Sequence, residues 1–334
     1  MNYIKMSPLT GMVGYGGGST GLTNTSASAA ERIGDRGIAM GGYASSADSN
    51  IIQYVNIAAG SGNMSDFGDL PYSARWVNAC AGSGYGFAVG GMGVWNPAEI
   101  NNISRVTIAT TGNSVDHGDL TEISSWCAAT SNGAKGFRSG GSGIGAGNYQ
   151  NTIDTWDCTN TAANATDFGD LSHVTRYNEM ECDGSRGLSI GGRSSQGQAS
   201  NDIEHFDTAS AGNATDVRNL TTTHTDGFAT GCDGTTVICM GGSHGSGNHE
   251  TCDYFTVQSN SDASDWGDLT SPKIYTRGAS NETRLVQLGG YITSGAGTTS
   301  QSDVVVYASQ GNAVDFGDLK SANGIERMGG CSGN

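Results

Sequence analysis

Asp167-Phe168-Gly169-Asp170-Leu171 is the stretch that decides how this sequence is read, because it recurs along the whole chain in complete or altered form. Self-similarity at a period of about 50 residues is typical of repeat architectures and takes precedence over any single local motif. The leucines that close the copies are Leu70, Leu120, Leu171, Leu220, Leu269 and Leu319.

One repeat, residues 172–220, shows the internal plan of every repeat. It contains four short stretches typical of β-strands, separated by Gly, Asn, Asp and Ser, and no helical period. The strands are expected at residues 176–182, 186–190, 201–206 and 216–220.

A glycine pair follows the second expected strand in each repeat, and a large apolar residue comes 13 to 18 residues after its first glycine. The glycines allow the backbone to bend where neighbouring units crowd, and the apolar residue fills the wedge between units. The pairs are Gly41-Gly42, Gly90-Gly91, Gly140-Gly141, Gly191-Gly192, Gly241-Gly242 and Gly289-Gly290. The apolar residues are Tyr54, Val106, Trp156, Phe206, Tyr254 and Tyr307.

The combination of these glycine pairs with an aromatic in the following strand resembles the Kelch-repeat β-propeller family. The resemblance covers residues 41–319 and implies an all-β propeller with four-stranded blades. Six glycine pairs predict six blades, with seven as the alternative if the termini form a partial blade. The Asn-x-Ile-x-x-aromatic strand, the Gly-Asn-Ala turn and the Asp-Phe-Gly-Asp-Leu stretch resemble the Kelch-like propellers of tailed phages, marine and cyanobacterial ones in particular.

The two ends of the chain are expected to take part in closing the ring. Residues 1–26 are interpreted as an N-terminal arm or closure strand, residues 27–319 as the propeller, and residues 320–334 as a C-terminal closure strand. Arg327 to Cys331 resemble an innermost strand that completes the blade at the other end of the chain. Closure of this kind removes exposed sheet edges.

Composition and charge exclude several classes of partner. The formal net charge is −16 and no Lys/Arg cluster is present, which argues against binding to nucleic acid. The sequence has no apolar run of ~18 residues for a membrane span, and residues 1–18 do not read as a secretory signal. The eight cysteines do not form a dense disulfide framework. Four recur at one position of the repeat and are interpreted as small buried thiols: Cys80, Cys182, Cys232 and Cys331. The alternative for one of them is that Cys232 and Cys239 face each other across a hairpin.

The second loop of each repeat differs in length and content, whereas the first and third turns are alike. Binding usually occupies variable loops on a rigid scaffold, and exposed aromatic residues stack on sugars or anchor protein partners. The alternative is that these are ordinary surface residues. The predicted binding residues are Tyr43, Trp95, Tyr149, Tyr291 and His244.

The first aspartate of the Asp-x-Gly-Asp-Leu copies has two possible roles. These aspartates include Asp66, Asp167, Asp265 and Asp315. One role is calcium binding, which needs several oxygens at close range. The preferred one is an Asx-turn in the outermost strand, in which the carboxylate caps backbone N–H groups. The altered copy at residues 216–220 carries Arg218 and supports the second reading.

Two other groups of polar residues are candidate binding sites. The spacing of His244, His249 and Cys252 is weak for zinc, and we predict neither a metal nor another cofactor. Recurring arginines after the closing leucine either line the mouth of the channel or form salt bridges within their repeat. These are Arg75, Arg176, Arg277 and Arg327.

The resemblance and the missing catalytic motifs together predict a non-enzymatic virion protein of the tail, fibre or capsid. It is expected to assemble in the host cytoplasm in multiple copies and to bind host surface glycan or another virion protein. One alternative is a polysaccharide-degrading enzyme on the same fold, and another is a cellular Kelch-type adaptor. The candidate carboxylates for the enzyme are Asp48, Glu99, Asp202 and Glu250.

Overall fold

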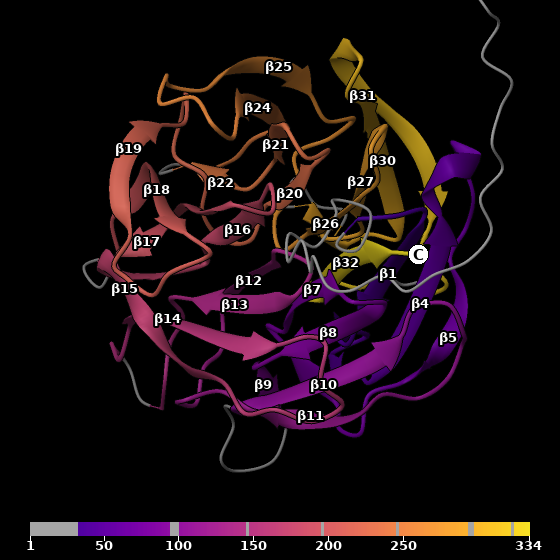
Figure 1. Cartoon of the computed structure of the whole chain (residues 1–334). Helices are drawn as coiled ribbons and strands as arrows, with labels where there is room; N and C mark the ends of the chain where they lie inside the picture. The colour runs from indigo at the N-terminus through magenta and orange to yellow at the C-terminus, as the bar shows by residue number, and fades with distance from the viewer. Residues whose placement is uncertain are drawn as a thin grey trace, which may run out of the picture.

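A computed structural model describes residues 33–93, 100–144, 147–194, 197–244, 247–292, 297–321 and 324–334. These residues form short antiparallel strands arranged as a ring, as in a β-propeller (Figure 1). The expected N-terminal arm, residues 1–26, lies outside the described part of the chain. One short 3₁₀ helix, η2 (Ile57–Ala59), interrupts the strands.

Four sheets have four strands each. They comprise β32 (Gly329–Gly333), β1 (Arg36–Met40), β4 (Ile51–Asn56) and β5 (Ser65–Asp69); β7 (Asn78–Gly82), β8 (Tyr85–Val89), β10 (Asn102–Thr107) and β11 (Val115–Asp119); β20 (Ala229–Cys232), β21 (Thr236–Met240), β24 (Thr251–Thr256) and β25 (Ser264–Asp268); and β26 (Arg277–Ser280), β27 (Arg284–Leu288), β30 (Gln301–Val306) and β31 (Ser309–Asp318).

The strands between these sheets belong to one eight-stranded sheet. Its members are β12 (Ala128–Ser131), β13 (Lys135–Ser139), β14 (Gln150–Asp157), β15 (Thr166–Arg176), β16 (Glu179–Cys182), β17 (Arg186–Ser194), β18 (Ala199–Asp207) and β19 (Thr215–Asn219). Two-stranded ribbons complete the fold: β2 (Tyr43–Ala44) with β3 (Ala47–Asp48), β6 (Ala74–Arg75) with β9 (Met92–Gly93), β22 (Ser243–His244) with β23 (Gly247–Asn248), and β28 (Tyr291–Ile292) with β29 (Gly297–Thr298).

The arrangement corrects the predicted number of blades. The described residues form four separate four-stranded blades, not six or seven, because the strands of two successive repeats merge into the eight-stranded sheet. Strands β15 and β17 join them, since Thr175 pairs with Ser194 and Arg176 with Arg193. An unusually long β15 therefore runs from the outer strand of one repeat into the connection that follows.

The C-terminal residues close the ring by pairing with the first described strand. Strand β32 runs antiparallel to β1, with Cys331 opposite Ile38 in the register. Residues almost 300 positions apart in sequence thus share one sheet, and β1 is not left as an exposed edge.

Each glycine pair lies where two neighbouring repeats meet. In the pair Gly191-Gly192, φ is 58° and 103°, values that favour glycine. The N–H of Gly192 donates to the carbonyl of His224 in the next repeat at 2.9 Å. A Cβ on Gly191 would lie 2.7 Å from the same oxygen, so a larger residue would force the repeats apart.

The Asp-x-Gly-Asp-Leu stretch clasps one repeat to the next. In each copy the backbone N–H of the fourth residue donates to a side-chain oxygen in the third turn of the following repeat, as Asp170 donates to Asn213 at 3.1 Å. The donor–acceptor pairs are Asp69–Asn113, Asp119–Asn164, Asp170–Asn213, Asn219–Asp262, Asp268–Asn312 and Asp318–Asn63. The last of these pairs joins the last repeat to the first.

The expected Asx-turn occurs in two copies. Asp167 accepts from the N–H of Gly169 at 3.2 Å, and Asp315 accepts from Gly317 at 3.1 Å. In two other copies the first acid has a different partner: Asp66 pairs with Lys320 at 3.0 Å on the exposed surface, and Asp116 accepts from the amide of Asn102 at 2.7 Å.

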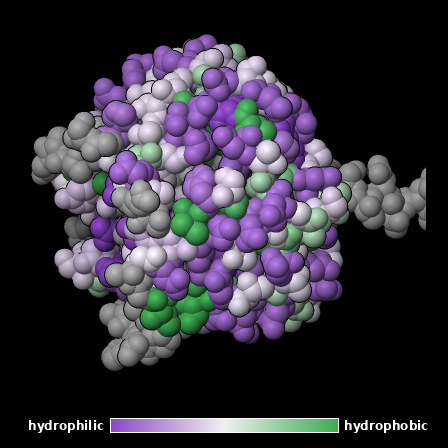
Figure 2. All heavy atoms as spheres, turned by 90° about the vertical axis from the view of Figure 1, so that its left-hand side faces the viewer, coloured by the Kyte–Doolittle hydropathy of each residue, from purple (hydrophilic) through white to green (hydrophobic). Residues whose placement is uncertain are grey.

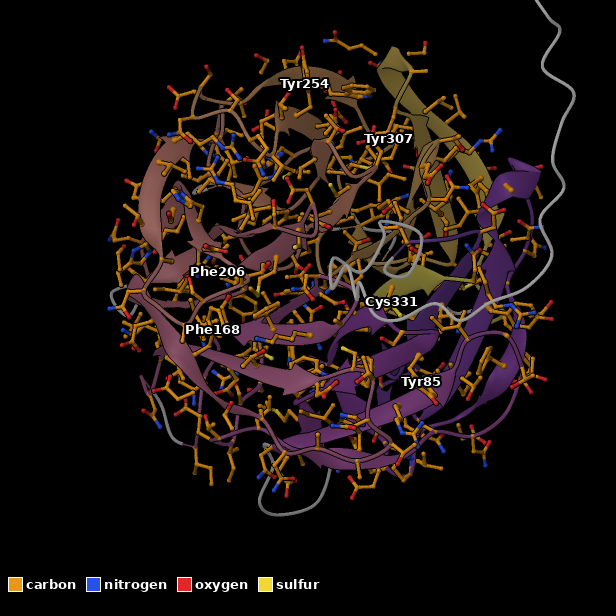
Figure 3. The ribbon with its side chains drawn as sticks, viewed as in Figure 1. Tyr85, Phe168, Phe206, Tyr254, Tyr307 and Cys331 are labelled. Carbon is orange, nitrogen blue, oxygen red and sulfur yellow. The ribbon has the colours of Figure 1, made fainter. Side chains whose placement is uncertain are left out.

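Aromatic and aliphatic side chains fill the wedges between sheets. Trp156 and Phe206 lie opposite Gly136 and Gly187, where a Cβ would come within 2.2 Å of the ring. Phe206 also packs edge-on to Phe168, with ring centroids 5.8 Å apart (Figure 3).

The apolar residues predicted for the other wedges are partly wrong. Val106 is buried as expected, but the equivalent buried positions elsewhere are Val55, Phe255 and Val305 rather than Tyr54, Tyr254 and Tyr307. Tyr54, Tyr254 and Tyr307 are half-buried instead and pack against the apolar clusters that contain Val106 or Val305. Outside these wedges the flank of the ring is mostly hydrophilic, with small apolar patches (Figure 2).

The clasp makes a prediction about two nearby glycines. Gly169 has a φ of 154°, and its Cβ would lie 2.3 Å from the carbonyl oxygen of Gly212, whereas a Cβ on Gly212 would meet nothing within 4 Å. We expect Gly169→Ala to lower the free energy of unfolding by about 1–3 kcal/mol. Gly212→Ala should change it by less than about 0.5 kcal/mol. Urea unfolding followed by circular dichroism measures both, and equal losses would contradict the clasp.

Candidate functional site

Six residues with left-handed backbone conformation surround the centre of the ring, each two or three positions before an innermost strand. We call them the hub residues: Trp76, Trp126, Tyr177, Asp226, Tyr275 and Arg327, with φ between 56° and 61°. This conformation costs a non-glycine residue roughly 1–2 kcal/mol. It turns the chain from the connecting segment into the innermost strand, and the surrounding structure must offset the cost.

Backbone hydrogen bonds link successive hub residues around the axis. The N–H of Tyr177 donates to the carbonyl of Trp126 at 2.9 Å, and that of Arg327 donates to Tyr275 at 2.8 Å. The other links run from Trp76 to Arg327 at 2.8 Å, from Trp126 to Trp76 at 3.4 Å and from Tyr275 to Asp226 at 2.9 Å. These bonds hold side chains from distant repeats at one end of the central channel.

The aromatic hub side chains pack on one another. The ring of Trp76 lies 5.6 Å from Trp126, 5.4 Å from Tyr177 and 4.9 Å from Tyr275, in edge-to-face contacts. Each contact of this kind contributes about 0.5–1.5 kcal/mol beyond the burial of area. Trp76 and Tyr177 are 6% and 8% exposed and form the floor, while Trp126 and Tyr275 are half-buried.

Arginines lie over these rings. The guanidinium carbon of Arg327 is 4.7 Å from the Trp76 ring, 4.6 Å from Tyr275 and 5.1 Å from Tyr43. The Arg75 guanidinium is 4.9 Å from the same Tyr43 ring. Cation–π contacts of this type are worth about 0.5–1 kcal/mol at exposed sites and more when desolvated.

Acidic side chains neutralise three of the arginines around the hub. Arg75 lies 3.5 Å from Asp48, Arg327 lies 3.3 Å from Glu326, and Arg193 lies 2.9 Å from Asp226. Burial raises the pKa of Asp48 and that of Glu326, and the neighbouring arginines oppose the rise.

Arg176 has a different environment. Its guanidinium lies 4.4 Å from the ring of Tyr149, 4.5 Å from Trp126 and 4.9 Å from Tyr177, and no ion pair to it occurs within the described ranges. Burial raises the pKa of Tyr177 to about 12, so its hydroxyl stays protonated at neutral pH. We call the hub aromatics with Tyr43, Tyr149, Arg75, Arg176 and Arg327 the mouth cluster.

The channel below the hub is closed by a layer of buried polar side chains. Glu179 forms an ion pair with Arg277 at 3.0 Å and accepts a hydrogen bond from the amide of Asn78 at 3.1 Å. The equivalent residues of the intervening repeats are small: Ala128, Ala229 and Gly329. Large polar and small residues therefore alternate around the axis, which lets the three long side chains meet there.

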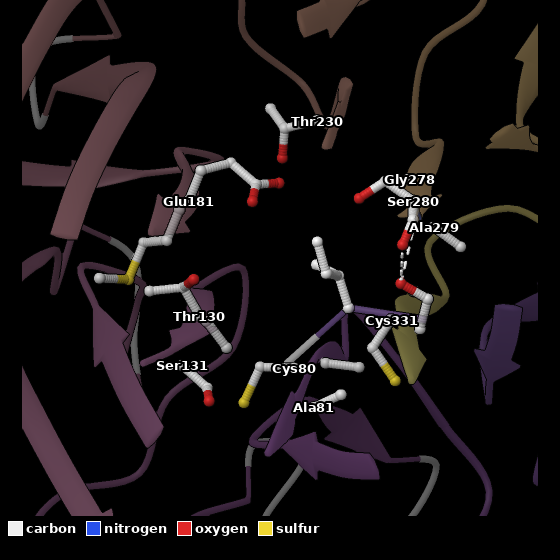
Figure 4. A pocket seen from close by; sticks show the side chains of 16 residues that line it. Cys80, Ala81, Thr130, Ser131, Glu181, Thr230, Gly278, Ala279, Ser280 and Cys331 are labelled. Atoms are coloured by element: carbon white, nitrogen blue, oxygen red, sulfur yellow. Dashed lines mark hydrogen bonds between the residues drawn. The ribbon is translucent and has the colours of Figure 1, made fainter. Parts of the chain in front are cut away.

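A small cavity of about 60 Å³ lies beyond this layer. Thr130, Glu181 and Thr230 lie around it (Figure 4). On the other side the Ser332 hydroxyl donates to the carbonyl of Ser280. The volume of this cavity suits solvent rather than a sugar or a peptide. The mouth cluster is therefore the candidate binding surface.

The variable loops begin beside the hub. Tyr43 pairs with Glu326, Ser142 with Ser125, Ser243 with Thr225 and Tyr291 with Ile274, each joining the start of a loop to the segment that carries a hub residue. The pairings of β6 with β9 and of Arg176 with Arg193 do the same in the remaining repeats. The loops and the mouth cluster consequently occupy one face of the ring.

The predicted binding residues are divided between the cluster and its surroundings. Tyr43 and Tyr149 stack on its arginines. Tyr291 is half-buried in β28, and His244 is exposed, with its Nδ1 2.9 Å from the Thr223 hydroxyl and 3.0 Å from that of Thr222. Trp95 lies outside the described residues.

The carboxylates considered for catalysis are not brought together in the described part of the chain. Asp48 is bound to Arg75, and Asp202 lies 3.9 Å from His173. Glu250 is exposed on another repeat, and Glu99 lies outside the described residues.

The histidines near β24 pack on each other. The rings of His224 and His249 are 4.6 Å apart, and His224 lies 3.3 Å from Asp253. Burial lowers the pKa of His249 to about 4 and keeps it neutral. Across the described ranges no group of three or more His, Cys, Asp or Glu side chains is arranged to hold a metal ion. All eight cysteines are buried.

Sequence reasoning missed the aromatic hub residues themselves. A signal was present, because Trp76, Trp126 and Tyr177 recur at the period of the repeat, directly before an expected innermost strand. Of the four arginines considered for the channel mouth, Arg75, Arg176 and Arg327 lie there. Arg277 is buried in the layer below.

Comparison with protein-family models and with curated proteins finds no match. The described residues include no helix long and apolar enough to cross a membrane.

Proposed function

We propose that this chain is a non-enzymatic binding protein built as a Kelch-like propeller, and that it serves as a structural or adhesion component of a phage virion. It attaches through its termini and one rim, and its loop-bearing face binds host surface glycan or another virion protein. The phage assignment rests on the sequence resemblance.

The mouth cluster is the observation that carries the binding proposal. Half-buried Trp and Tyr rings with arginines between them are the side chains most enriched in binding hot spots. Here they stand at the centre of the face from which the variable loops start, with Tyr43 and Tyr149 contributed by those loops. The left-handed backbone of the hub residues adds a conformational cost that is typical of functional positions.

The Kelch-like repeat plan of this proposal is supported by two features of the ring. The clasp between an outer strand and the following turn is repeated six times, including the link from Asp318 to Asn63. The eight-stranded sheet divides into β12 to β15 and β16 to β19, two antiparallel sets of four with the same order as the separate blades.

Binding measurements with two kinds of material test the proposal. We expect the purified chain to bind surface polysaccharide of the host bacterium or to co-purify with virions. The double variant Tyr43→Ala, Tyr149→Ala should bind at least roughly tenfold more weakly, as expected for the loss of hot-spot side chains. Tyr85→Ala is the matched control, because this half-buried tyrosine stands at the opposite end of an innermost hairpin, beside Gly82.

Two results would count against the proposal. Failure to bind either material would contradict the binding function. Release of oligosaccharide from the polysaccharide would show catalysis and favour the enzyme alternative.

A further inference from the structure

Arg176 combines two properties that the other arginines around the hub do not share. Its guanidinium lies over aromatic rings, with the ring centroids of Tyr149 and Trp126 both within 4.5 Å of the guanidinium carbon, and it has no ion pair in the described part of the chain. Stacking uses the faces of a guanidinium and leaves the N–H groups at its edge free to donate in the plane. A carboxylate matches such an edge with two parallel hydrogen bonds.

The charge of Arg176 is also left without a carboxylate in the described part of the chain, whereas Arg75, Arg193 and Arg327 each have one. An arginine held in an aromatic cage loses little conformational entropy when it binds, since its planar side chain is already ordered. The protein as a whole carries a formal net charge of −16, so an unneutralised cation at the centre of one face is a local exception.

Two shielded donors at this place have no acceptor among the described residues. They are Nε of Arg176 and the indole Nε1 of Trp126, which belong to the same cage. These two atoms are shielded from a ligand, whereas the terminal N–H groups of the Arg176 guanidinium are not among the shielded atoms, so they are the donors that an acceptor from outside the chain can reach. The geometry therefore offers positive charge, N–H donors and aromatic surface together.

We propose that Arg176, with Tyr149 and Trp126, forms a subsite for the carboxylate of an acidic saccharide of the uronic-acid type. This inference rests on the proposed binding function and specifies its ligand. The carboxylate pairs with the edge of the Arg176 guanidinium, and the sugar ring lies against the adjoining aromatic surface.

A saccharide suits this surface better than the acidic side chain of a protein partner. A stable protein interface covers about 800 Å² on each partner around an apolar core. The floor of the mouth cluster is buried, and among the described residues only Ile144, in the loop that carries Tyr149, is a strongly exposed large apolar side chain near it, since Val115 and Val314 lie on the outer strands β11 and β31. Caged charge and small aromatic surfaces instead suit a compact anionic sugar.

Calorimetric titration with α-1,4-linked oligogalacturonate and with its methyl ester tests the inference. We expect wild-type protein to bind the acid at least tenfold more tightly than the ester, with an affinity that falls as salt is added. Arg176→Gln should lose this preference, and Arg176→Lys should recover only part of it because lysine lacks the planar fork. Arg105→Gln should change nothing, although Arg105 also stacks on a tyrosine ring at 4.7 Å.

The possible outcomes separate the inference from the function on which it rests. Equal binding of acid and ester, or an unchanged preference in both Arg176 variants, would overturn the saccharide subsite. Equally strong displacement by a poly-glutamate peptide would overturn it in favour of a protein ligand. If the protein binds virion proteins or neutral glycans independently of Arg176, the proposed function stands without this subsite, whereas binding to nothing removes both.

Discussion

Deletion of residues 329–334 is expected to abolish cooperative folding of the ring. This segment contains all of β32, the innermost strand of the first sheet, which pairs with β1 over five residue pairs from Arg36–Gly333 to Met40–Gly329. Without it the N–H and C=O groups of β1 become an unpaired edge, and such edges recruit other chains. We expect loss of a single sharp thermal transition and aggregates in size-exclusion chromatography.

The strand also connects two repeats that are otherwise far apart in sequence. The Ser332 hydroxyl donates to the carbonyl of Ser280 in β26, and the backbone N–H of Ser280 donates back at 3.2 Å. Cys331 is buried in the apolar cluster formed with β1 and β7. Deletion of β32 therefore removes one strand of the sheet, the hydrogen bonds to the neighbouring repeat and part of the apolar core together.

A shorter deletion is the matched control for this prediction. Removing only Asn334 eliminates the hydrogen bond from the Asp35 N–H at 3.0 Å and leaves β32 intact, so the melting temperature should fall by only a few degrees. Addition of a synthetic peptide of residues 327–334 to the truncated chain should restore some of the cooperative transition. A truncated protein that melts like wild type would show that closure by β32 is dispensable.

The repeated stretches made the strands of this fold predictable. For the repeat at residues 172–220, the expected strands at 186–190, 201–206 and 216–220 overlap β17, β18 and β19. Their turn residues and glycine pair act locally, so a single sequence contains the information. The expected innermost strand at 176–182 started too early, because the left-handed backbone of Tyr177 separates Arg176 from β16.

The candidate site was less predictable because it exists only after the ring has closed. Asn78 and Glu179 are 101 positions apart and belong to different repeats, yet they share a hydrogen bond on the axis. Whether these two side chains meet depends on the number of repeats in the ring and on which residue of each innermost strand points inward. The merged eight-stranded sheet was likewise unforeseen, since it depends on two residue pairs in the connection after β15.

Arg277→Met is expected to destabilise the protein strongly at neutral and alkaline pH. The substitution removes the cation 3.0 Å from Glu179, and Glu179 has no access to solvent that would replace it. Breaking a buried ion pair by removing one partner typically costs about 3–5 kcal/mol, because an uncompensated charge remains inside. Urea unfolding at pH 8 measures the loss, and Glu179→Gln combined with Arg277→Met should restore part of the free energy of unfolding.

The pH dependence of the same pair separates its charge from its packing. Burial raises the pKa of Glu179 from 4.5 to about 7, outweighing the opposing effect of Arg277. The folded state thus binds a proton that the unfolded state releases, so this stabilisation is complete below about pH 4.5 and is lost as the pH rises through about 7. The shift corresponds to roughly 3 kcal/mol in the free energy of unfolding.

Glu179→Gln should abolish that part of the pH dependence, which is measured as the difference in unfolding free energy from wild type at pH 5 and pH 8. In Arg277→Met the pKa of Glu179 should rise further, because the lowering effect of the guanidinium is gone. The destabilisation by Arg277→Met should then be smaller at pH 5, where Glu179 is protonated, than at pH 8. The same loss at both pH values would assign the role of Arg277 to packing alone and contradict a charge pair on the axis of the ring.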